Sequence, residues 1–185
     1  GIDCDFDTDQ KADRIIVSRN GEQLVNANMQ SNGGRKAVAA FFNQLLDEQL
    51  RGPTKMVCLD EGAFTDTQAP LISLGGSASI ASFADLTDTA PDSRRFRLNI
   101  IVETTTPFEE ASLIGKTLAV GDVRLDVVEP VGRCAAIDID PQTAERGPHY
   151  LPLMKQVLGH TDLGIFTVVA HGGMISTDDG FCVLP

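Results

Sequence analysis

The first third of the chain carries one hairpin pattern and one helical pattern. Residues 14–18 and 22–26 flank Asn20-Gly21, a dipeptide that tolerates the positive φ angles of a type I′ turn, so they predict a β-hairpin. Within residues 36–50, apolar side chains recur at spacings of three and four, and Gly52-Pro53 follows. This spacing predicts an amphipathic helix that packs one face on another element. The acidic segment 1–13 is expected to be only partly ordered.

After residue 52 the pattern becomes short and strand-like. Apolar, partly β-branched stretches bounded by Gly, Pro or Asp predict strands, and the Gly121-Asp122 turn predicts a second hairpin. The predicted strands are residues 55–59, 70–74, 98–103, 117–120, 123–127, 134–139, 164–170 and 181–184. Two short helices interrupt them, one capped by Ser77 and one over residues 151–158 that ends at Gly159.

Many short strands with few helices predict a sandwich or closed barrel rather than a parallel βαβ sheet. We therefore expect a mainly β fold with flanking helices. Residues 1–59 would form an N-terminal hairpin and helix, and residues 60–185 a β-barrel domain. The longest apolar runs are too short to cross a bilayer, and the N-terminus lacks the pattern of a signal peptide.

Charge and cysteine content narrow the possible partners. The formal net charge of -11 argues against a nucleic-acid-binding or anionic-membrane surface, although a few arginines can still form a local anion site. The four cysteines Cys4, Cys58, Cys134 and Cys182 lie far apart without a C-x-x-C pair. We therefore expect neither a zinc site nor a disulfide framework, and we expect a reducing, cytoplasmic setting.

Cys134 has the sequence context that best favours reactivity. Pro130 breaks the preceding strand, and the guanidinium of the adjacent Arg133 favours the thiolate, which is the form that binds metals or attacks electrophiles. An isolated cysteine is nevertheless more often a small buried packing residue. From its neighbours alone, both interpretations stay open.

Two further segments can bind an anion. In the basic cluster 93–99, Arg97 and Asn99 would project from one face of a strand and could hold a phosphate. A solvated loop paired with nearby carboxylates explains the cluster about as well. Segment 73–80, which contains Ser79, is rich in Gly and Ser and would present backbone N–H groups at a helix start, although simple capping is the commoner explanation.

Taken in order, these fragments resemble the MOSC domain family over residues 60–185. The motifs that carry the resemblance include Ser77-Ala78-Ser79-Ile80, Phe96-Arg97-Leu98-Asn99, Arg133-Cys134-Ala135-Ala136, Asp140-Pro141-Gln142-Thr143 and Gly172-Gly173-Met174-Ile175. Members include the C-terminal domain of molybdenum cofactor sulfurase, the mitochondrial amidoxime-reducing components and bacterial reductases of N-hydroxylated bases. The resemblance implies a β-barrel and a molybdopterin cofactor, the molybdenum cofactor.

By position, the resemblance implies that Cys134 is the metal ligand or a sulfur carrier. It also implies that Arg97, Asn99, Ser79 and Arg133 contact the cofactor. The expected activity is that of an oxidoreductase that reduces N-hydroxylated small molecules with electrons from a separate donor protein. One alternative is a carrier that receives persulfide sulfur on Cys134 from a cysteine desulfurase, and another is a non-catalytic binder of a phosphate-bearing ligand.

The chain departs from the family pattern in places. Leu98 stands where many relatives have proline, and Gly132 where they often have serine. The opening strands of the family's N-terminal barrel half are missing. Residues 1–59 are therefore expected to be a remnant of that half.

Overall fold

The computed structural model describes residues 3–6, 13–57, 59, 64–65, 67 and 69–185. The chain forms two compact units, Gly1–Gly62 (unit 1) and Ala63–Pro185 (unit 2). Each unit is described by itself below.

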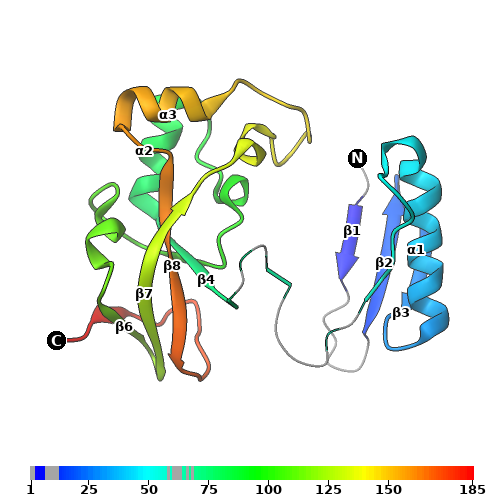
Figure 1. Ribbon diagram of the computed structural model, residues 1–185, viewed down its shortest axis with the longest axis horizontal. Helices are drawn as coiled ribbons and strands as arrows, with labels where there is room; N and C mark the ends of the chain where they lie inside the picture. The colour runs from blue at the N-terminus through cyan, green and yellow to red at the C-terminus, as the bar shows by residue number, and fades with distance from the viewer. Residues whose placement is uncertain (1–2, 7–12, 58, 60–63, 66, 68) are drawn as a thin grey trace. The chain divides into compact units, whose positions relative to one another are not determined.

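Unit 1 is a three-stranded antiparallel sheet with one helix (Figure 1). The predicted hairpin is confirmed: β2 (Arg14–Arg19) and β3 (Glu22–Asn28) pair through a turn in which Asn20 and Gly21 have φ angles of 53° and 78°. A third strand, β1 (Asp3–Phe6), was not expected from its acidic sequence. Its backbone pairs with β2, so ladder hydrogen bonding orders a segment that lacks an apolar pattern.

Helix α1 (Asn32–Leu46), followed by the 3-10 turn η1 (Asp47–Gln49), confirms the predicted helix with earlier bounds. The helix begins at residue 32 because Ser31 accepts a hydrogen bond from the Gly34 amide at 2.9 Å. Its Val38 is fully buried. The strand predicted at 55–59 is wrong for residues 55–57 and 59, which are irregular, while Cys58 lies outside the described residues.

Unit 2 contains a six-stranded sheet curled into a half-barrel, which confirms the mainly β class (Figure 1). Its order is β5-β4-β8-β7-β6-β9. The strands are β4 (Ile72–Gly76), β5 (Ile100–Val102), β6 (Thr117–Val120), β7 (Val123–Gly132), β8 (Asp162–His171) and β9 (Phe181–Val183). Among the described residues β5 and β9 remain edges, so the sheet is open rather than the closed barrel expected.

The strand pairs are antiparallel except one. β4 and β5 run parallel and are joined across helix α2 (Ser77–Thr87), so one parallel βαβ unit lies within a sheet that is otherwise antiparallel. The second predicted hairpin is confirmed, since β6 and β7 pair through Gly121 at φ 52°.

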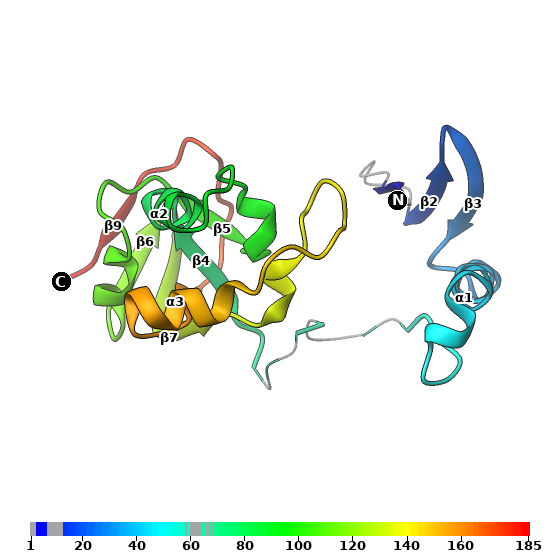
Figure 2. The same ribbon diagram turned by 90° about the horizontal axis from the view of Figure 1, so that it is seen from above.

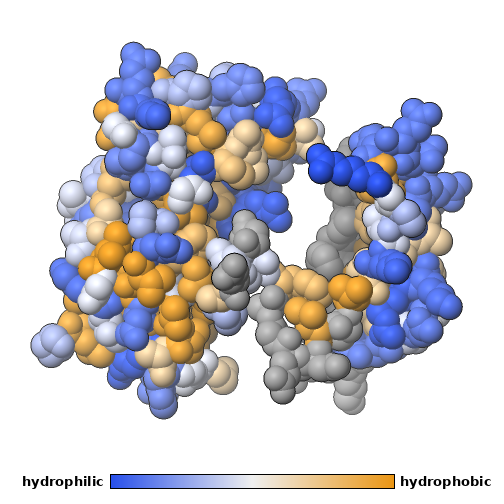
Figure 3. Space-filling view, viewed as in Figure 1, coloured by the Kyte–Doolittle hydropathy of each residue, from blue (hydrophilic) through white to orange (hydrophobic). Residues whose placement is uncertain are grey.

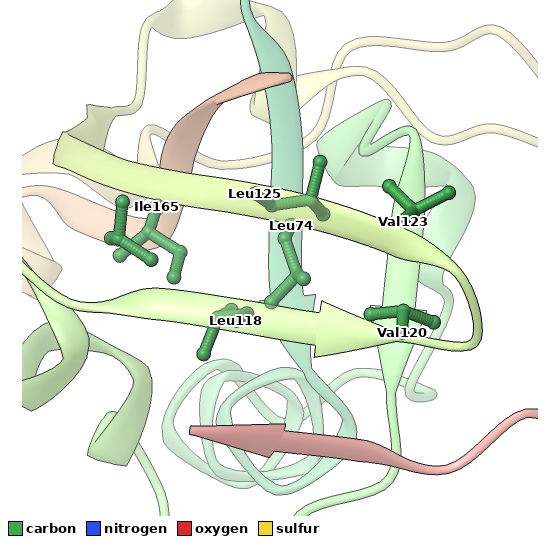
Figure 4. Packing of buried hydrophobic residues seen from close by; sticks show 7 residues of the cluster. Leu74, Leu118, Val120, Val123, Leu125 and Ile165 are labelled. Carbon is green, nitrogen blue, oxygen red and sulfur yellow. The ribbon is translucent and has the colours of Figure 1, made fainter. Parts of the chain in front are cut away.

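The hollow of the half-barrel holds the first apolar core. Alternate residues of the strands point inward, and Leu74, Leu118, Leu125 and Ile165 are at most 1% exposed. Figure 4 shows these four side chains converging from β4, β6, β7 and β8. The same alternation that predicted the strands therefore builds this core.

A second core joins α2 to helix α3 (Tyr150–Leu158), and Figures 1 and 2 show both helices at the same end of unit 2. The rings of Phe83 and Phe96 meet edge to face at 5.0 Å, and those of Phe83 and Tyr150 at 5.4 Å. Helix α3 ends at Gly159 with φ 81°, as predicted. Within the described residues no helix is long and apolar enough to span a membrane.

The strand predicted at 134–139 is wrong. Residues Ala135–Asp138 form a 3-10 turn, η4. The amides of Ile137 and Ile139 bond locally to the carbonyls of Cys134 and Ala136, both at 3.2 Å, so they do not join a ladder. The strand predicted at 98–103 shortens to β5 because the preceding 3-10 turn η2 (Ser93–Phe96) ends at Arg97 in the left-handed region, at φ 52°.

Candidate functional site

A cavity of about 990 Å³ opens in unit 2 where four chain segments meet. Its walls come from β4 with the residues before it, from the 95–99 segment, from the end of β7 with η4, and from β8. Of the five residues proposed from the sequence, Cys134, Arg133, Arg97 and Asn99 line this cavity together. An apolar wall faces into it from Leu71, Phe166, Val168 and Val169.

Cys134 is a free, exposed thiol at the junction of β7 and η4. Its backbone is extended, with φ -114° and ψ 176°, and it is separated from the last residue of β7 only by Arg133. The amide of Arg133 donates to the Thr161 carbonyl at 2.9 Å. This bond fixes the end of β7 to the segment that enters β8.

Arg133 presents an unsatisfied cationic group beside that thiol. Its Nη1 donates to the Phe96 carbonyl at 2.8 Å, and its guanidinium lies 5.9 Å from the Phe96 ring centre. Its Nη2 is buried and has no hydrogen-bond partner among the described residues. Burial lowers the pKa of Arg133 to about 10, and the nearby charges of Cys134 and Asp162 oppose this only in part. A buried guanidinium N–H without an acceptor is suited to an anionic ligand.

Asn99 is oriented by Ser73 of β4. The Asn99 Oδ1 accepts from the backbone amide and the hydroxyl of Ser73, each at 2.9 Å. The backbone amide of Asn99 donates to the Ser73 Oγ at 3.1 Å. Both acceptor positions of the side-chain amide are therefore used, and its Nδ2 has no partner within the described part of the chain. Arg97 is exposed, and its guanidinium makes no hydrogen bond or ion pair to any described residue.

Arg97 and Asn99 reach the cavity by a route other than strand alternation, because both precede β5. Leu98 between them packs on the sheet, where its methyl carbons lie 2.5 Å from the position of a Cβ on Gly75 and 3.1 Å from one on Gly164. These glycines let the loop approach the sheet closely. The loop therefore buries Leu98 and leaves its polar neighbours at the cavity.

Ser79, the fifth proposed residue, does not line the cavity. It is fully buried in the first turn of α2, where its Oγ donates to Glu110 Oε2 at 2.8 Å and accepts from the Phe108 amide at 2.7 Å. The predicted cap Ser77 is the first residue of the helix, and Gly76 is the N-cap. The hydroxyl-rich segment thus ties α2 to the 104–110 loop.

Two charged residues near the cavity were not among the five site residues proposed from the sequence. Arg95 is 8% exposed, lines the cavity and donates from Nη1 to the Ile137 and Ile139 carbonyls at 2.8 and 3.2 Å. Asp138 is 1% exposed and accepts from the backbone amide of Tyr150 at 3.1 Å. Arg95 belongs to the basic cluster 93–99, and Asp138 lies in the segment predicted as a strand, where the sequence did not indicate its partners. No group of three or more His, Cys, Asp or Glu side chains in the described ranges is placed to hold a metal ion.

Comparison with known proteins identifies the class. The MOSC domain profile matches residues 64–181, the part of the chain that contains the cavity. The chain belongs to the MOSC domain family. It is also similar to molybdenum cofactor sulfurase of Drosophila mojavensis, Drosophila ananassae and Drosophila melanogaster, at 41%, 40% and 38% identity over 73 residues. Each match covers 39% of this chain and only 9% of the relative's length.

Proposed function

We propose that unit 2 binds the molybdenum cofactor in the 990 Å³ cavity, with Cys134 at the metal end. The observation that carries the proposal is the convergence of one exposed thiol with three nitrogen donors, those of Arg133, Arg97 and Asn99, on a single cavity. A thiolate suits a soft transition metal, and arginine suits a phosphate. The volume lies at the upper end of the range of about 300–1,000 Å³ for small-molecule sites.

The donor set fits such a ligand for a specific reason. The unpartnered, buried Nη2 of Arg133 requires an acceptor that the described residues do not provide. An anionic oxygen there would satisfy it, because a buried donor without an acceptor costs about 1–3 kcal/mol. Arg97 and the free Nδ2 of Asn99 supply further donors.

The proposed activity is reduction of an N-hydroxylated small molecule to the parent base. Two electrons and two protons convert the N–OH group to N–H and water, with the electrons delivered by a separate donor protein. When bound, the cofactor supplies the two-electron oxygen-transfer chemistry. Cys134 would hold the metal end, Arg133 and Arg97 would hold the anionic end, and Phe166 and Val168 would form an apolar wall beside the bound group.

Expression in a host that makes the cofactor tests this proposal. Wild type, Cys134→Ser and the matched control Cys182→Ser would be compared, since Cys182 is the other free exposed cysteine in the described chain. Molybdenum and pterin per protein would be measured, together with benzamidoxime reduction using reduced methyl viologen. We expect Cys134→Ser alone to abolish reduction. Full activity in that variant, or wild type without molybdenum, would contradict the proposal.

A second candidate, sulfur transfer through Cys134, is favoured by the sulfurase relatives. The thiolate would take the terminal sulfur of a desulfurase persulfide, so one S–S bond breaks as another forms and no external electron is needed. Mass spectrometry after incubation with a cysteine desulfurase and cysteine would detect one added sulfur atom on Cys134. A Cys134 peptide of unchanged mass, beside a modified desulfurase, would refute this candidate. A binder of another phosphate-bearing ligand is the outcome if neither metal nor sulfur is found.

A further inference from the structure

The two loops that carry the site residues are tied together by two arginines acting in opposite directions. We call residues 93–99 the anion loop and residues 131–140 the thiol loop. Arg95 of the anion loop donates to the carbonyls of Ile137 and Ile139 in the thiol loop, at 2.8 and 3.2 Å. Arg133 of the thiol loop donates back to the Phe96 carbonyl at 2.8 Å. These three bonds therefore help to set the separation of Cys134 from Arg97.

Arg95 is held rigidly in this arrangement. Its side chain is 6% exposed, forms an ion pair with Asp140 at 3.5 Å, and lies over the Tyr150 ring at 5.5 Å. A buried guanidinium is costly unless its donors are bonded, so its geometry is strongly restricted. Only the planar fork of arginine reaches two carbonyls and a carboxylate from one side chain.

The thiol loop is held on its other side as well. The Asp138 carboxylate accepts from the Tyr150 amide at 3.1 Å and from His149 Nδ1 at 2.9 Å. Tyr150 begins α3, which is part of the second apolar core. The loop after Cys134 is thus fixed between Arg95 and α3, and among the described residues Arg95 and Arg133 supply the side-chain hydrogen bonds that join it to the anion loop.

We propose that Arg95 is a positioning residue, which sets the separation between Cys134 and the Arg97–Asn99 donors so that one ligand reaches both. Arg95 acts through the Ile137 and Ile139 carbonyls. This inference rests on the proposed cofactor binding.

The test is the protection of Cys134 from iodoacetamide by bound cofactor, followed by peptide mass spectrometry. The full 185-residue chain would be purified with cofactor from a competent host and without cofactor from a host that cannot make it. Cys182 is an internal reference, because it is exposed on β9 and outside the cavity lining. The variants are Arg95→Met and Arg95→Lys. Arg94→Met is the matched control, since Arg94 is 60% exposed and bonds only Asp92 of its own turn.

We expect cofactor to slow alkylation of Cys134 in wild type and Arg94→Met. In Arg95→Met the protection should fall about tenfold, the factor that corresponds to about 1.4 kcal/mol, while Cys182 reacts as before. Hydrogen exchange of the cofactor-free protein should be faster at the amides of residues 137–140 only. Arg95→Lys keeps the positive charge but not the planar fork, so the protection of Cys134 in this variant should lie between that in wild type and that in Arg95→Met.

Each outcome has a distinct meaning. Full protection of Cys134 in cofactor-loaded Arg95→Met overturns the positioning role while leaving the proposed function intact. If Arg95→Met does not fold, wild-type protection in Arg95→Lys overturns it equally. No protection in wild type itself overturns the proposed cofactor binding, and the inference with it.

Discussion

Removal of the Asp138 carboxyl is expected to loosen the loop that carries Cys134. This carboxylate is 1% exposed and accepts from the Tyr150 amide at 3.1 Å, from His149 Nδ1 at 2.9 Å and from Arg146 Nη1 at 3.3 Å. It therefore joins the turn η4 to the first residue of α3. Asp138→Ala breaks all three bonds at once.

The magnitude follows from the burial of each partner. Loss of the acceptor for the buried Tyr150 amide costs about 1–3 kcal/mol. The His149 and Arg146 side chains are 73% and 55% exposed, so each adds at most about 1 kcal/mol. The sum is about 1–5 kcal/mol. With an unfolding entropy of about 2.1 cal/mol/K per residue, a unit of this size should melt roughly 4–19 °C lower.

Asp138→Asn separates the charge from the hydrogen bond, because its amide oxygen can still accept from Tyr150. Burial opposes ionisation of Asp138, but the hydrogen bonds from Tyr150 and His149 and the charges of His149 and Arg146 lower its pKa on balance. A carboxyl with a lowered folded pKa stabilises fully above its ordinary value of about 3.9, and this contribution is lost as the pH falls through the folded pKa. The asparagine variant should lack that acid-dependent loss.

Thermal unfolding by circular dichroism from pH 7 to pH 3 measures both effects. Asp126→Ala is the control, because Asp126 is exposed on β7 and its carboxylate accepts, among the described residues, only from the Thr117 hydroxyl. The expected order of melting temperatures at pH 7 is wild type, Asp138→Asn, then Asp138→Ala. An unchanged melting temperature in the alanine variant, or an acid dependence in the asparagine variant equal to wild type, would refute the reasoning.

Three further substitutions test the sheet, the cavity and the helix start. Gly164→Ala should lower the free energy of unfolding by about 2–3 kcal/mol, because the residue has φ 89° and a Cβ there would lie 2.7 Å from a backbone oxygen. Gly172→Ala is the control, because a Cβ at that position has nothing within 4 Å, and its calorimetric stability should be unchanged. Equal melting temperatures of the two variants would contradict this. Asn99→Asp keeps an oxygen that can accept from Ser73, but it replaces the Nδ2 donor with a negatively charged oxygen. The molybdenum content per protein should therefore fall about tenfold or more. An undiminished metal content would count against the site. Ser79→Ala should lower the free energy of unfolding by about 1–3 kcal/mol, because Glu110 and the Phe108 amide lose their hydrogen-bond partner. The folded variant should still bind cofactor. A selective loss of cofactor would instead show that Ser79 contacts the ligand.

The elements that the sequence predicted well are those decided within a few residues. Asn20-Gly21 and Gly121 impose their turns by backbone conformation alone, and Gly159 ends α3 in the same way. Alternation of Val123, Leu125 and Val127 identified β7 as a strand because one face of that strand packs on the core. The family resemblance added the grouping of Cys134, Arg97 and Asn99, which spacing alone left undecided.

The errors arose where distant partners compete with local pattern. The apolar alternation of 134–139 is compatible with a strand, but Arg95 takes two carbonyls of this segment from a position about forty residues earlier in the chain. The exposure of apolar strand residues is also decided by the tertiary structure. Val128, Val168 and Val169 are 40–43% exposed although they belong to strands, and Figure 3 shows hydrophobic residues among hydrophilic ones over the region of β7 and β8.

The sequence by itself determined the hairpins, the helices and the mainly β class, because each depends on neighbouring residues. Only the tertiary structure decided that the sheet stays open, that Ser79 is enclosed with Glu110, and that Arg95 and Asp138 fix the loop beside Cys134. Those features depend on hydrogen bonds between segments far apart in the chain. No local spacing encodes them, since a buried donor takes whichever acceptor the packed fold brings within reach.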